Sequence, residues 1–353
     1  MHFGETSFAT MKRLQEIYHK GYRPTANQLC LDAYVQSPEY VQDAQTAKIY
    51  YYSDELNREE AGRIATNREP VNIAMVRFYD QDALQKQFGY RTGLYSDPTS
   101  KTRDGQPFAA RPNTVAIYGE TRLWSRPGDA TTAKRIACLS LPAPALDTRS
   151  QPHFSYYVSE GQLESDKYLK EMKRLAQVVV QAAIEHKDSA RGGEGLARLV
   201  IPLYGQGNFL NALEEGDKNI ARAHFFTSLR EALSSHAKEL QGIKIAISTF
   251  NNSCNVGGKG DEVDQLVVAI KNQGLQAARI VGDILQTAEE GDLIVNAWDP
   301  HSAPGNGNDG DSSFDGSMGK GSAIGAVQWP LINSYLNDPN RYVSLALSDD
   351  IVR

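Results

Sequence analysis

Residues 199–209 read LVIPLYGQGNF, a short apolar run that passes directly into a turn with two glycines. A run that is apolar at every position, and too short for a helix, is typical of a strand covered on both faces. Similar runs occupy residues 136–142, 243–250, 278–281 and 292–296. Helical segments lie between several of these runs, so the sequence predicts an α/β fold with a mostly parallel sheet and helices on both faces.

The predicted helices span Ser165–His186, Asp217–Leu240 and Glu262–Asn272, where apolar residues recur at helical spacing. In the first of them, Leu169, Met172, Leu175 and Val179 form one stripe. After the run that ends at Asn296, we expect a long loop over residues 300–319 and a last helix over residues 322–336.

The chain of 353 residues suggests two domains, at about 150 residues per domain. Residues 1–130 are rich in Tyr, Arg, Gln and Asn and contain few long apolar runs, the clearest strands being 71–79 and 114–118. We therefore expect an accessory α+β region over residues 1–130, with a seam near residues 125–129, and the α/β domain over residues 134–353. The accessory region would form one wall of a cleft or dock a protein substrate.

The composition excludes several classes of protein. Lys and Arg number 37 against 43 Asp and Glu, a net charge of −6, which argues against nucleic acid and membrane surfaces as partners. No apolar run reaches the roughly 18 residues of a transmembrane helix, and no signal-peptide pattern is visible. Cys30, Cys138 and Cys254 form no metal-binding or disulfide pattern, which fits a reducing compartment. We expect a soluble, cytosolic protein without a cofactor.

In open α/β sheets, ligands bind beyond the carboxyl ends of the strands. The strand that ends at Leu203 leads into Gly205, Gly207, Asn208 and Phe209. Two glycines let backbone N–H groups approach an anion closely, and a following helix would add its N-terminal dipole. A tight strand-to-helix turn is the alternative explanation, because a single Gly-x-Gly is weak evidence for an anion site.

An acidic segment follows the strand that ends at Asn296. Residues 297–316 read AWDPHSAPGNGNDGDSSFDG, and their polar candidates are Asp299, His301, Asn306, Asn308, Asp309, Asp311 and Asp315. A calcium loop counted from Asp309 would need Gly and Glu where the chain has Phe314 and Lys320. A solvated surface loop is the other alternative, although Trp298 and Phe314 offer apolar anchors. Crowded carboxylates shift one another's pKa values and so separate acid and base roles, which favours a functional segment.

These features together resemble the macrodomain family, whose members bind ADP-ribose. Residues 278–299 read ARIVGDILQTAEEGDLIVNAWD, and the family has a strand, Gly-Asp-Ile, a short link and a strand ending Ile-Val-Asn-Ala-Ala-Asn. The resemblance covers roughly residues 134–340 and includes the phosphate-side loop at residues 201–207. It implies that Asp283 accepts a hydrogen bond from the adenine amino group, with Ile284 beside it and Asn296 at the second strand end.

The chain departs from the family pattern in three ways. The phosphate-side loop precedes the adenine-side strand, which implies a circularly permuted fold. Domains tolerate such a permutation when their termini lie close together. Asp299 stands where the family has its second Asn, and the acidic segment replaces a Gly-Gly-Gly-Val turn, so the family's catalytic details do not transfer. The amino-acid sequence of the acidic segment resembles that of macrodomain-like ADP-ribosylhydrolases among Legionella effectors. That resemblance implies a bacterial effector in the host cytosol, with ubiquitin as a candidate for the modified protein.

The expected activity is removal of ADP-ribose from modified protein side chains, with arginine as the linkage. Cleavage of an N-glycosidic bond passes through an oxocarbenium-like state, which needs one carboxylate to activate water or stabilise the cation and an acid for the leaving group. Asp309, Asp311 and Asp315 are the candidates for this work, with Asp299 against the distal ribose. Two alternatives stay open: a module that binds ADP-ribose without cleaving it, and a transferase or Mg-dependent hydrolase whose aspartates hold the cation.

Overall fold

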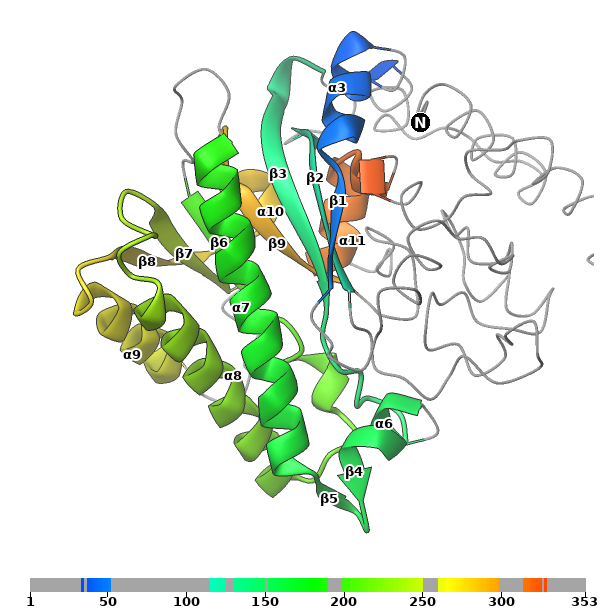
Figure 1. Ribbon diagram of the computed structural model, residues 1–353. Coiled ribbons are helices and arrows are strands. Elements are labelled where there is room, and N and C mark those ends of the chain that lie inside the picture. Colours follow the sequence, from blue (N-terminus) through cyan, green and yellow to red (C-terminus); the bar gives the residue numbers. More distant parts are fainter. Residues whose placement is uncertain are drawn as a thin grey trace, which may run out of the picture.

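The computed structural model describes residues 33–34, 37–51, 115–124, 130–149, 152–189, 198–249, 260–298, 314–325 and 327–328. Within these ranges the chain forms a seven-stranded sheet in the order β1-β2-β3-β9-β6-β7-β8 and a separate pair, β4-β5 (Figure 1). The strands are β1 (Lys48–Tyr51), β2 (Val115–Trp124), β3 (Ala133–Pro142), β4 (Val158–Ser159), β5 (Gln162–Leu163), β6 (Arg198–Pro202), β7 (Lys244–Thr249), β8 (Gln276–Val281) and β9 (Leu293–Trp298).

The sheet is mostly parallel, as predicted. Strands β3, β9, β6, β7 and β8 are neighbours in this order, and each pair runs parallel. Strand β2 is antiparallel to both β1 and β3. Although β9 is the last strand described along the chain, it lies in the middle of the sheet between β3 and β6. Segments that are far apart in the sequence therefore meet at the carboxyl ends of these strands.

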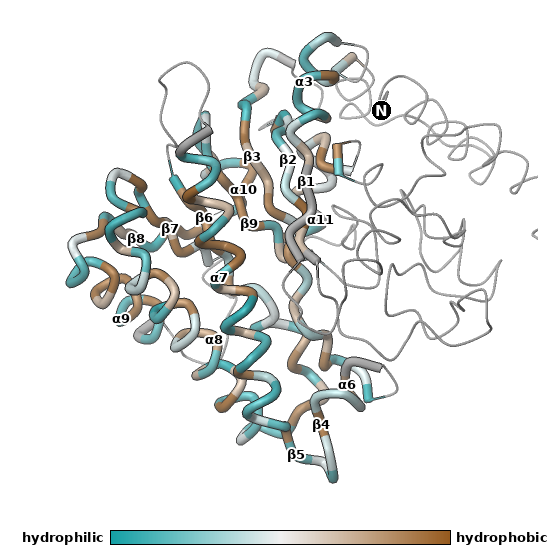
Figure 2. Tube along the Cα trace, viewed as in Figure 1, coloured by the Kyte–Doolittle hydropathy of each residue, from teal (hydrophilic) through white to brown (hydrophobic). Residues whose placement is uncertain are grey.

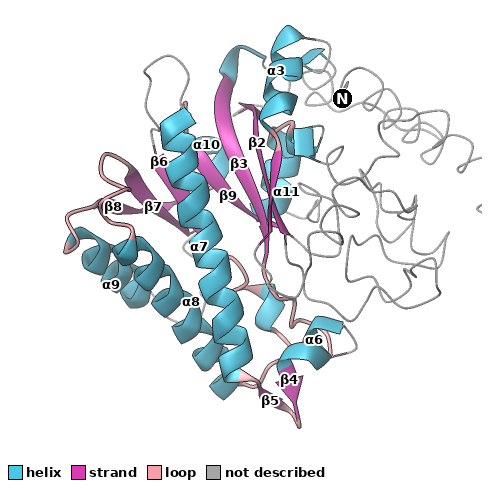
Figure 3. Ribbon diagram, viewed as in Figure 1, coloured by secondary structure: helices cyan, strands magenta, loops and turns pink. Residues whose placement is uncertain are grey.

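Helices cover both faces of the sheet, which confirms the predicted α/β class (Figures 1 and 3). They are α3 (Pro38–Thr46), α6 (Pro152–Tyr157), α7 (Ser165–Ser189), α8 (Glu215–Ser235), α9 (Gly260–Lys271), α10 (Ile284–Thr287) and α11 (Phe314–Gly321), with short 3₁₀ turns η3 (Ala130–Thr132) and η5 (Asn208–Leu210). Helices α7, α8 and α9 pack on one face, and α10 and α11 on the other. Among the described residues, no helix combines the length and the apolar character needed to cross a membrane.

Alternate residues of each central strand supply two apolar cores. On β9, Leu293 and Val295 belong to the larger core under α7, α8 and α9, whereas Ile294 belongs to the smaller core under α10 and α11. Because both faces are buried, such strands must be apolar at nearly every position. Figure 2 shows this apolar character along the central strands.

The predicted helices over residues 165–186, 217–240 and 262–272 are present, with ends that shift by a few residues, whereas most of the last one, predicted over residues 322–336, lies outside the described residues. Helix α7 continues to Ser189, and α8 spans Glu215–Ser235 in place of residues 217–240. The prediction of a loop over residues 300–319 is wrong in its last part, because α11 begins at Phe314. Phe314 and Met318 lie one helical turn apart and both pack into the smaller core. The glycines between and around them concealed this helix in the sequence.

The described part of residues 1–130 continues the sheet. Strand β2, whose first residues were predicted as a strand, pairs with β3 from Ile117 opposite Ser140 to Trp124 opposite Ala133. Residues on both sides of the predicted boundary near residue 130 thus belong to the same sheet. The strand predicted at residues 71–79 and the seam at residues 125–129 lie outside the described residues.

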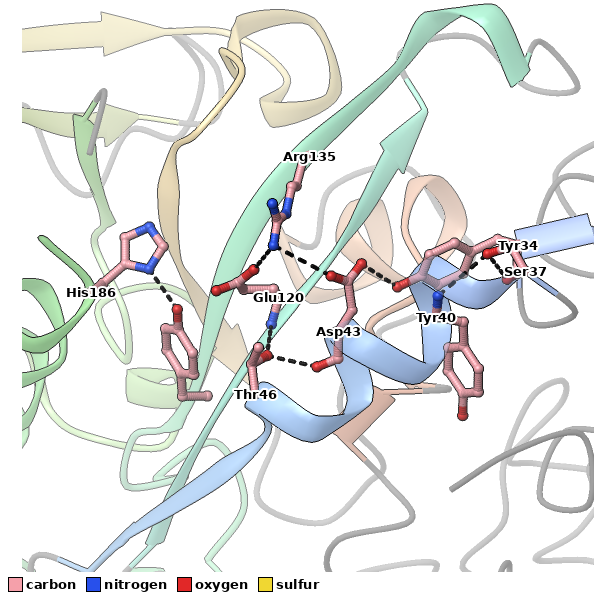
Figure 4. A network of polar contacts seen from close by, with 9 residues as sticks. Tyr34, Ser37, Tyr40, Asp43, Thr46, Glu120, Arg135 and His186 are labelled. Atoms are coloured by element: carbon pink, nitrogen blue, oxygen red, sulfur yellow. Dashed lines mark hydrogen bonds and ion pairs between the residues drawn. The ribbon is translucent and has the colours of Figure 1, made fainter. Parts of the chain in front are cut away.

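A buried polar network ties α3 to this sheet (Figure 4). Tyr34 donates to Asp43 Oδ2 at 2.8 Å, and Arg135, which pairs with Glu120, lies 3.6 Å from Asp43 Oδ1. Thr46 Oγ1 donates to the backbone oxygen of Asp43 at 2.6 Å and accepts from the Glu120 N–H at 3.0 Å. Burial raises the pKa of Asp43, against the lowering effect of Tyr34 and Arg135. The network anchors an N-terminal helix on β2 and β3.

A second buried ion pair joins the amino ends of β6 and β9. Asp292 is fully buried and accepts from Arg198 Nη2 at 2.7 Å and Nε at 3.1 Å, and from the Glu289 N–H at 2.7 Å. Burial raises the pKa of Asp292, and the hydrogen bonds from Arg198 oppose this shift. Removing one partner of such a pair leaves a buried charge without compensation.

Arg198→Met is therefore expected to lower the free energy of unfolding by about 3–5 kcal/mol near neutral pH, measured by urea denaturation. The folded-state pKa of Asp292 lies above its ordinary value and should rise further without Arg198, so the ionised form is the unfavourable one. The deficit should be largest above that pKa and shrink as the pH falls through it. Arg149→Met, in a pair whose side chains are 71% and 77% exposed, is the control and should cost less than about 0.5 kcal/mol. Equal losses for the two variants would contradict the prediction.

Candidate functional site

The carboxyl ends of the parallel strands meet along one edge of the sheet. The segment after β6 contains Gly205, Gly207, Asn208 and Phe209, that after β8 contains Asp283 and Ile284, and Asn296 lies near the end of β9. The structure thus brings three groups of predicted site residues to a common edge. Asp299, His301, Asn306, Asn308, Asp309 and Asp311 lie outside the described residues, whereas Asp315 lies in α11.

The turn after β6 is shaped by Gly205. This residue has a φ of 72°, which favours glycine, and a Cβ at this position would lie 2.6 Å from the Cβ of Ala143. Two backbone hydrogen bonds hold the turn against the segment after β3: Leu146 N–H donates to Phe209 at 2.7 Å, and Ala212 N–H donates to Leu146 at 3.1 Å. The turn is therefore a fixed structure packed on its neighbour.

This turn presents backbone N–H groups that have no acceptor within the described part of the chain. They belong to Gly205, Gly207, Asn208 and Phe209. Gly207 and Asn208 are exposed, and a Cβ on Gly207 would meet no atom within 4 Å. Successive free N–H groups beside open space form a concavity that suits an anion. This geometry supports the anion site predicted from the two glycines.

Gly205→Ala is expected to lower the free energy of unfolding by about 1–3 kcal/mol, because an L residue is strained at this φ and its methyl group would overlap Ala143. Gly161→Ala is a matched control, since Gly161 has a φ of 80° but no atom within 4 Å of a built Cβ. The difference between the two variants in the free energy of unfolding gives the contribution of the steric overlap with Ala143. Adding Ala143→Gly to Gly205→Ala should recover that contribution in urea denaturation, and no recovery would contradict the packing argument.

Asp283 caps the short helix α10. Its Oδ1 accepts from the Leu285 N–H at 3.0 Å, and its other carboxylate oxygen has no partner in the described residues. The Ile284 N–H likewise has no acceptor there, while the Ile284 side chain is fully buried. An acceptor beside a donor complements the amino group and ring nitrogen of adenine. Helix capping alone is the competing explanation for an Asp at this position.

Asn296 and Asp315 lie together in the interior. Asn296 is 0% exposed and Asp315 is 2% exposed. Asn296 Nδ2 donates to Asp315 Oδ1 at 2.6 Å and to Ser140 Oγ at 3.1 Å. The prediction that Asp315 belongs to a loop is wrong, because it lies in the first turn of α11, held there by the packing of Phe314 and Met318. These two predicted site residues contact each other.

Three buried polar atoms at this edge have no hydrogen-bond partner among the described residues. They are Gln206 Oε1 in the turn after β6, Ser248 Oγ on β7 and Asn296 Oδ1 on β9. Native proteins leave few buried polar atoms unsatisfied, so Gln206 Oε1 and Ser248 Oγ are groups that a bound molecule could use, whereas the Asn296 amide is held by Ser140 and Asp315. Ser140 and Ser248 were missed in the sequence, where the only signal was a single hydroxyl within an apolar run.

A separate Ser–His contact joins α7 to α8. Ser165 Oγ lies 2.7 Å from His224 Nε2, and burial lowers the pKa of His224. Within the described residues no carboxylate bonds the other ring nitrogen, so the pair lacks the third group that orients a catalytic histidine. We interpret it as a link between two helices. The described residues also contain no group of three His, Cys, Asp or Glu side chains placed to hold a metal ion.

Comparisons with known proteins identify no family: no protein-family model matches the sequence, and no curated protein matches it. The sheet edge itself and the sequence motifs that it carries are therefore what indicates a function.

Proposed function

We propose that the chain binds ADP-ribose along the carboxyl edge of its sheet and hydrolyses the bond between ADP-ribose and a modified protein side chain, with arginine as the linkage. The observation that carries the proposal is the turn after β6, whose backbone N–H groups at Gly205, Gly207, Asn208 and Phe209 have no acceptor among the described residues and which lies at the same edge as Asp283. One feature suits a diphosphate and the other suits adenine.

The diphosphate would lie on the turn after β6. Its four N–H groups that have no acceptor among the described residues can donate to phosphate oxygens, and the exposed side of Gly207 leaves room for a close approach. Hydrogen bonds to a charged acceptor are stronger than neutral ones. A turn of this kind binds an anion without a basic side chain, which agrees with the net negative charge of the chain.

Adenine would lie against Asp283 and Ile284. Strands β6 and β8 are separated by β7, so their ends are two strand spacings apart, about 10 Å. This separation is of the order of that between the base and the diphosphate in an extended nucleotide. The two features are therefore placed for different parts of one ligand.

The strand order also supports a circularly permuted macrodomain. The phosphate-side strand β6 precedes the adenine-side strand β8 in the chain, which is the reverse of the family order noted above. Yet β9 inserts between β3 and β6, and the carboxyl ends of β6, β8 and β9 share one edge. A permuted chain needs this arrangement to keep the family's binding elements together.

Hydrolysis would use the carboxylates of the acidic segment. The acidic segment connects β9, which ends at Trp298, to α11, which begins at Phe314, and Asp299, Asp309 and Asp311 are its candidate carboxylates. One carboxylate would activate water, whose oxygen attacks the anomeric carbon of the ribose. The C–N bond breaks, its electron pair goes to the guanidine nitrogen, and an acid protonates that nitrogen. The products are ADP-ribose and the protein with an unmodified arginine side chain.

The test is incubation with a protein ADP-ribosylated on arginine, with released ADP-ribose measured by chromatography and ADP-ribose affinity by calorimetry. Release together with binding supports the hydrolase. Binding without release would identify a module that only recognises ADP-ribose, which the described turn and Asp283 could serve without further residues. Absence of binding would contradict the proposal as a whole.

Two additional comparisons refine the assay. Release that survives EDTA would exclude a divalent cation held by the loop aspartates. Faster release from ADP-ribosylated ubiquitin than from another arginine-modified protein would support ubiquitin as the target and an effector role in a host cell. Equal release rates from the two proteins would indicate that the enzyme recognises the bond between ADP-ribose and arginine and not the modified protein.

A further inference from the structure

A buried chain of hydrogen bonds crosses the sheet beneath the candidate site. Gln328 Nε2 donates to the backbone oxygens of Ile117 and Cys138, both at 2.9 Å. With the amide nitrogen committed to these carbonyls, Gln328 Oε1 must accept, and Ser140 Oγ donates to it at 2.6 Å. The single hydroxyl hydrogen of Ser140 is thereby used, so its oxygen accepts from Asn296 Nδ2.

This direction fixes the orientation of Asn296. Its two amide hydrogens go to Ser140 Oγ and to Asp315 Oδ1, and turning the amide round would place its oxygen against both acceptors. Asn296, Ser140 and Gln328 are each 0% exposed, and Asp315 is 2% exposed. Water therefore does not substitute for these partners, and the chain specifies one arrangement.

The hydrogen bond between Asn296 and Asp315 joins β9 to α11 through two residues that are 19 positions apart in the sequence. Asn296 lies in β9, just before the acidic segment, and Asp315 lies near the end of that segment, in the first turn of α11. The residues just after α11 are also attached to the sheet, because the Ala323 N–H donates to the backbone oxygen of Arg122 at 3.1 Å. Strand β9 and helix α11 are thus held in one relative position.

We propose that Asn296 and Asp315 form a buried clamp that fixes the exit of the chain from β9 relative to its entry into α11. The clamp makes both of them positioning residues for hydrolysis. Ser140 and Gln328 set its direction. The inference rests on the proposed hydrolase function, because the carboxylates that it would position are those of residues 299–313. Adenine and diphosphate contacts lie on other strands, so the clamp acts on turnover and not on ADP-ribose affinity.

Asn296→Asp tests the clamp with almost no change of shape. It places two carboxylates at the 2.6 Å separation now spanned by a hydrogen bond, so they repel unless they share one proton. We expect release of ADP-ribose from arginine-modified protein to fall at least tenfold at pH 8, with the ADP-ribose Kd within about threefold of wild type. The ratio of mutant to wild-type turnover should recover as the pH falls, because a shared proton restores the hydrogen bond.

The pH dependence has its own controls. The Cys138 thiol interacts electrostatically with Asp315, and burial raises the pKa of this thiol well above its ordinary value, so Cys138→Ala should not alter the pH profile. Asn296→Asp combined with Asp315→Asn removes the carboxylate pair, and the pH dependence of the ratio should disappear. Asn272→Asp makes the same chemical change at an exposed position of the chain, and its ratio of mutant to wild-type turnover should not depend on pH.

A ratio that does not change with pH, or an ADP-ribose affinity that falls in parallel with turnover, would overturn the proposal. If Asn296→Asp does not fold, Ser140→Ala removes one of the two anchors of Asn296 and should still lower turnover without weakening binding. If the wild-type protein releases no ADP-ribose, the hydrolase function fails together with the positioning role. Thermal unfolding of the same variants would then show whether the clamp itself exists. If it does, the Tm of Asn296→Asp should recover at low pH even though no ADP-ribose is released.

Discussion

Replacing Asp309 or Asp311 by asparagine is expected to lower the release of ADP-ribose by about 100- to 10,000-fold, the usual contribution of general acid–base catalysis. Asparagine retains the shape and one hydrogen-bond acceptor, but it cannot accept a proton or carry the full negative charge opposite an oxocarbenium-like state. Affinity for ADP-ribose should change little, or improve, because a negative charge near the diphosphate is removed. Single-turnover release and calorimetry on the same variants measure the two quantities separately.

Asp315→Asn tests a residue of a different kind. Its carboxylate is buried and accepts from Asn296, so we expect a loss that arises through the clamp and is smaller than that of the loop aspartates. Asp264→Asn, at a side chain 61% exposed on α9, is the matched control and should leave release unchanged. If the Asp309, Asp311 and Asp315 variants all stay within a few-fold of wild type, these carboxylates are not catalytic. The role would then pass to Asp299 or His301, or the protein would bind ADP-ribose without cleaving it.

The class of fold could be predicted because the central strands are buried on both faces. Strands such as β6 and β7 need apolar residues at nearly every position, and this requirement is local, so it is visible in the sequence. Helix α11 was missed because its apolar contacts come from only Phe314 and Met318 among glycines and polar residues. Its stability depends on the core that it meets, which is not visible locally.

The grouping of the candidate site residues could be predicted where they directly follow a strand. Gly205, Asp283 and their neighbours lie at strand ends, and parallel strands bring those ends to one edge. The clamp was not predictable, because it depends on the position of β9 between β3 and β6. Ser140 and Gln328 are 188 residues apart, and nothing in the local sequence of Gln328 indicates that it completes a hydrogen-bond chain under the site.

The extension of the sheet by β1 and β2 also depends on long-range contacts that the local sequence does not indicate. On β2, Ala116 and Tyr118 point into the larger core, and both are buried, but the strand also contains Glu120 and Arg122. Such a mixed pattern indicates a strand without indicating which sheet it joins. Its pairing with β3 is fixed by long-range contacts, including the pair of Arg135 with Glu120.

Asp283→Ser is expected to weaken ADP-ribose binding by about 10- to 100-fold without lowering the Tm. Serine caps a helix about as well as aspartate, so the hydrogen bond from the Leu285 N–H can be kept. What serine cannot supply is the second carboxylate oxygen, which has no partner among the described residues and would accept from the adenine amino group. A hydrogen bond to a charged group contributes about 1.5–3 kcal/mol, which corresponds to the expected loss.

Asp283→Ala separates the two roles, because it removes the cap as well and should lower both the affinity and the Tm. Asp283→Asn adds a test of direction. Its side-chain oxygen would stay on the Leu285 N–H, so its NH₂ group would face the adenine amino group and binding should fall as in the serine variant. The analogue with hypoxanthine in place of adenine offers a carbonyl oxygen at that position, and the preference for ADP-ribose over it should narrow in Asp283→Asn. If the serine variant binds ADP-ribose as tightly as wild type, Asp283 is a helix cap only, and adenine recognition lies elsewhere on this edge.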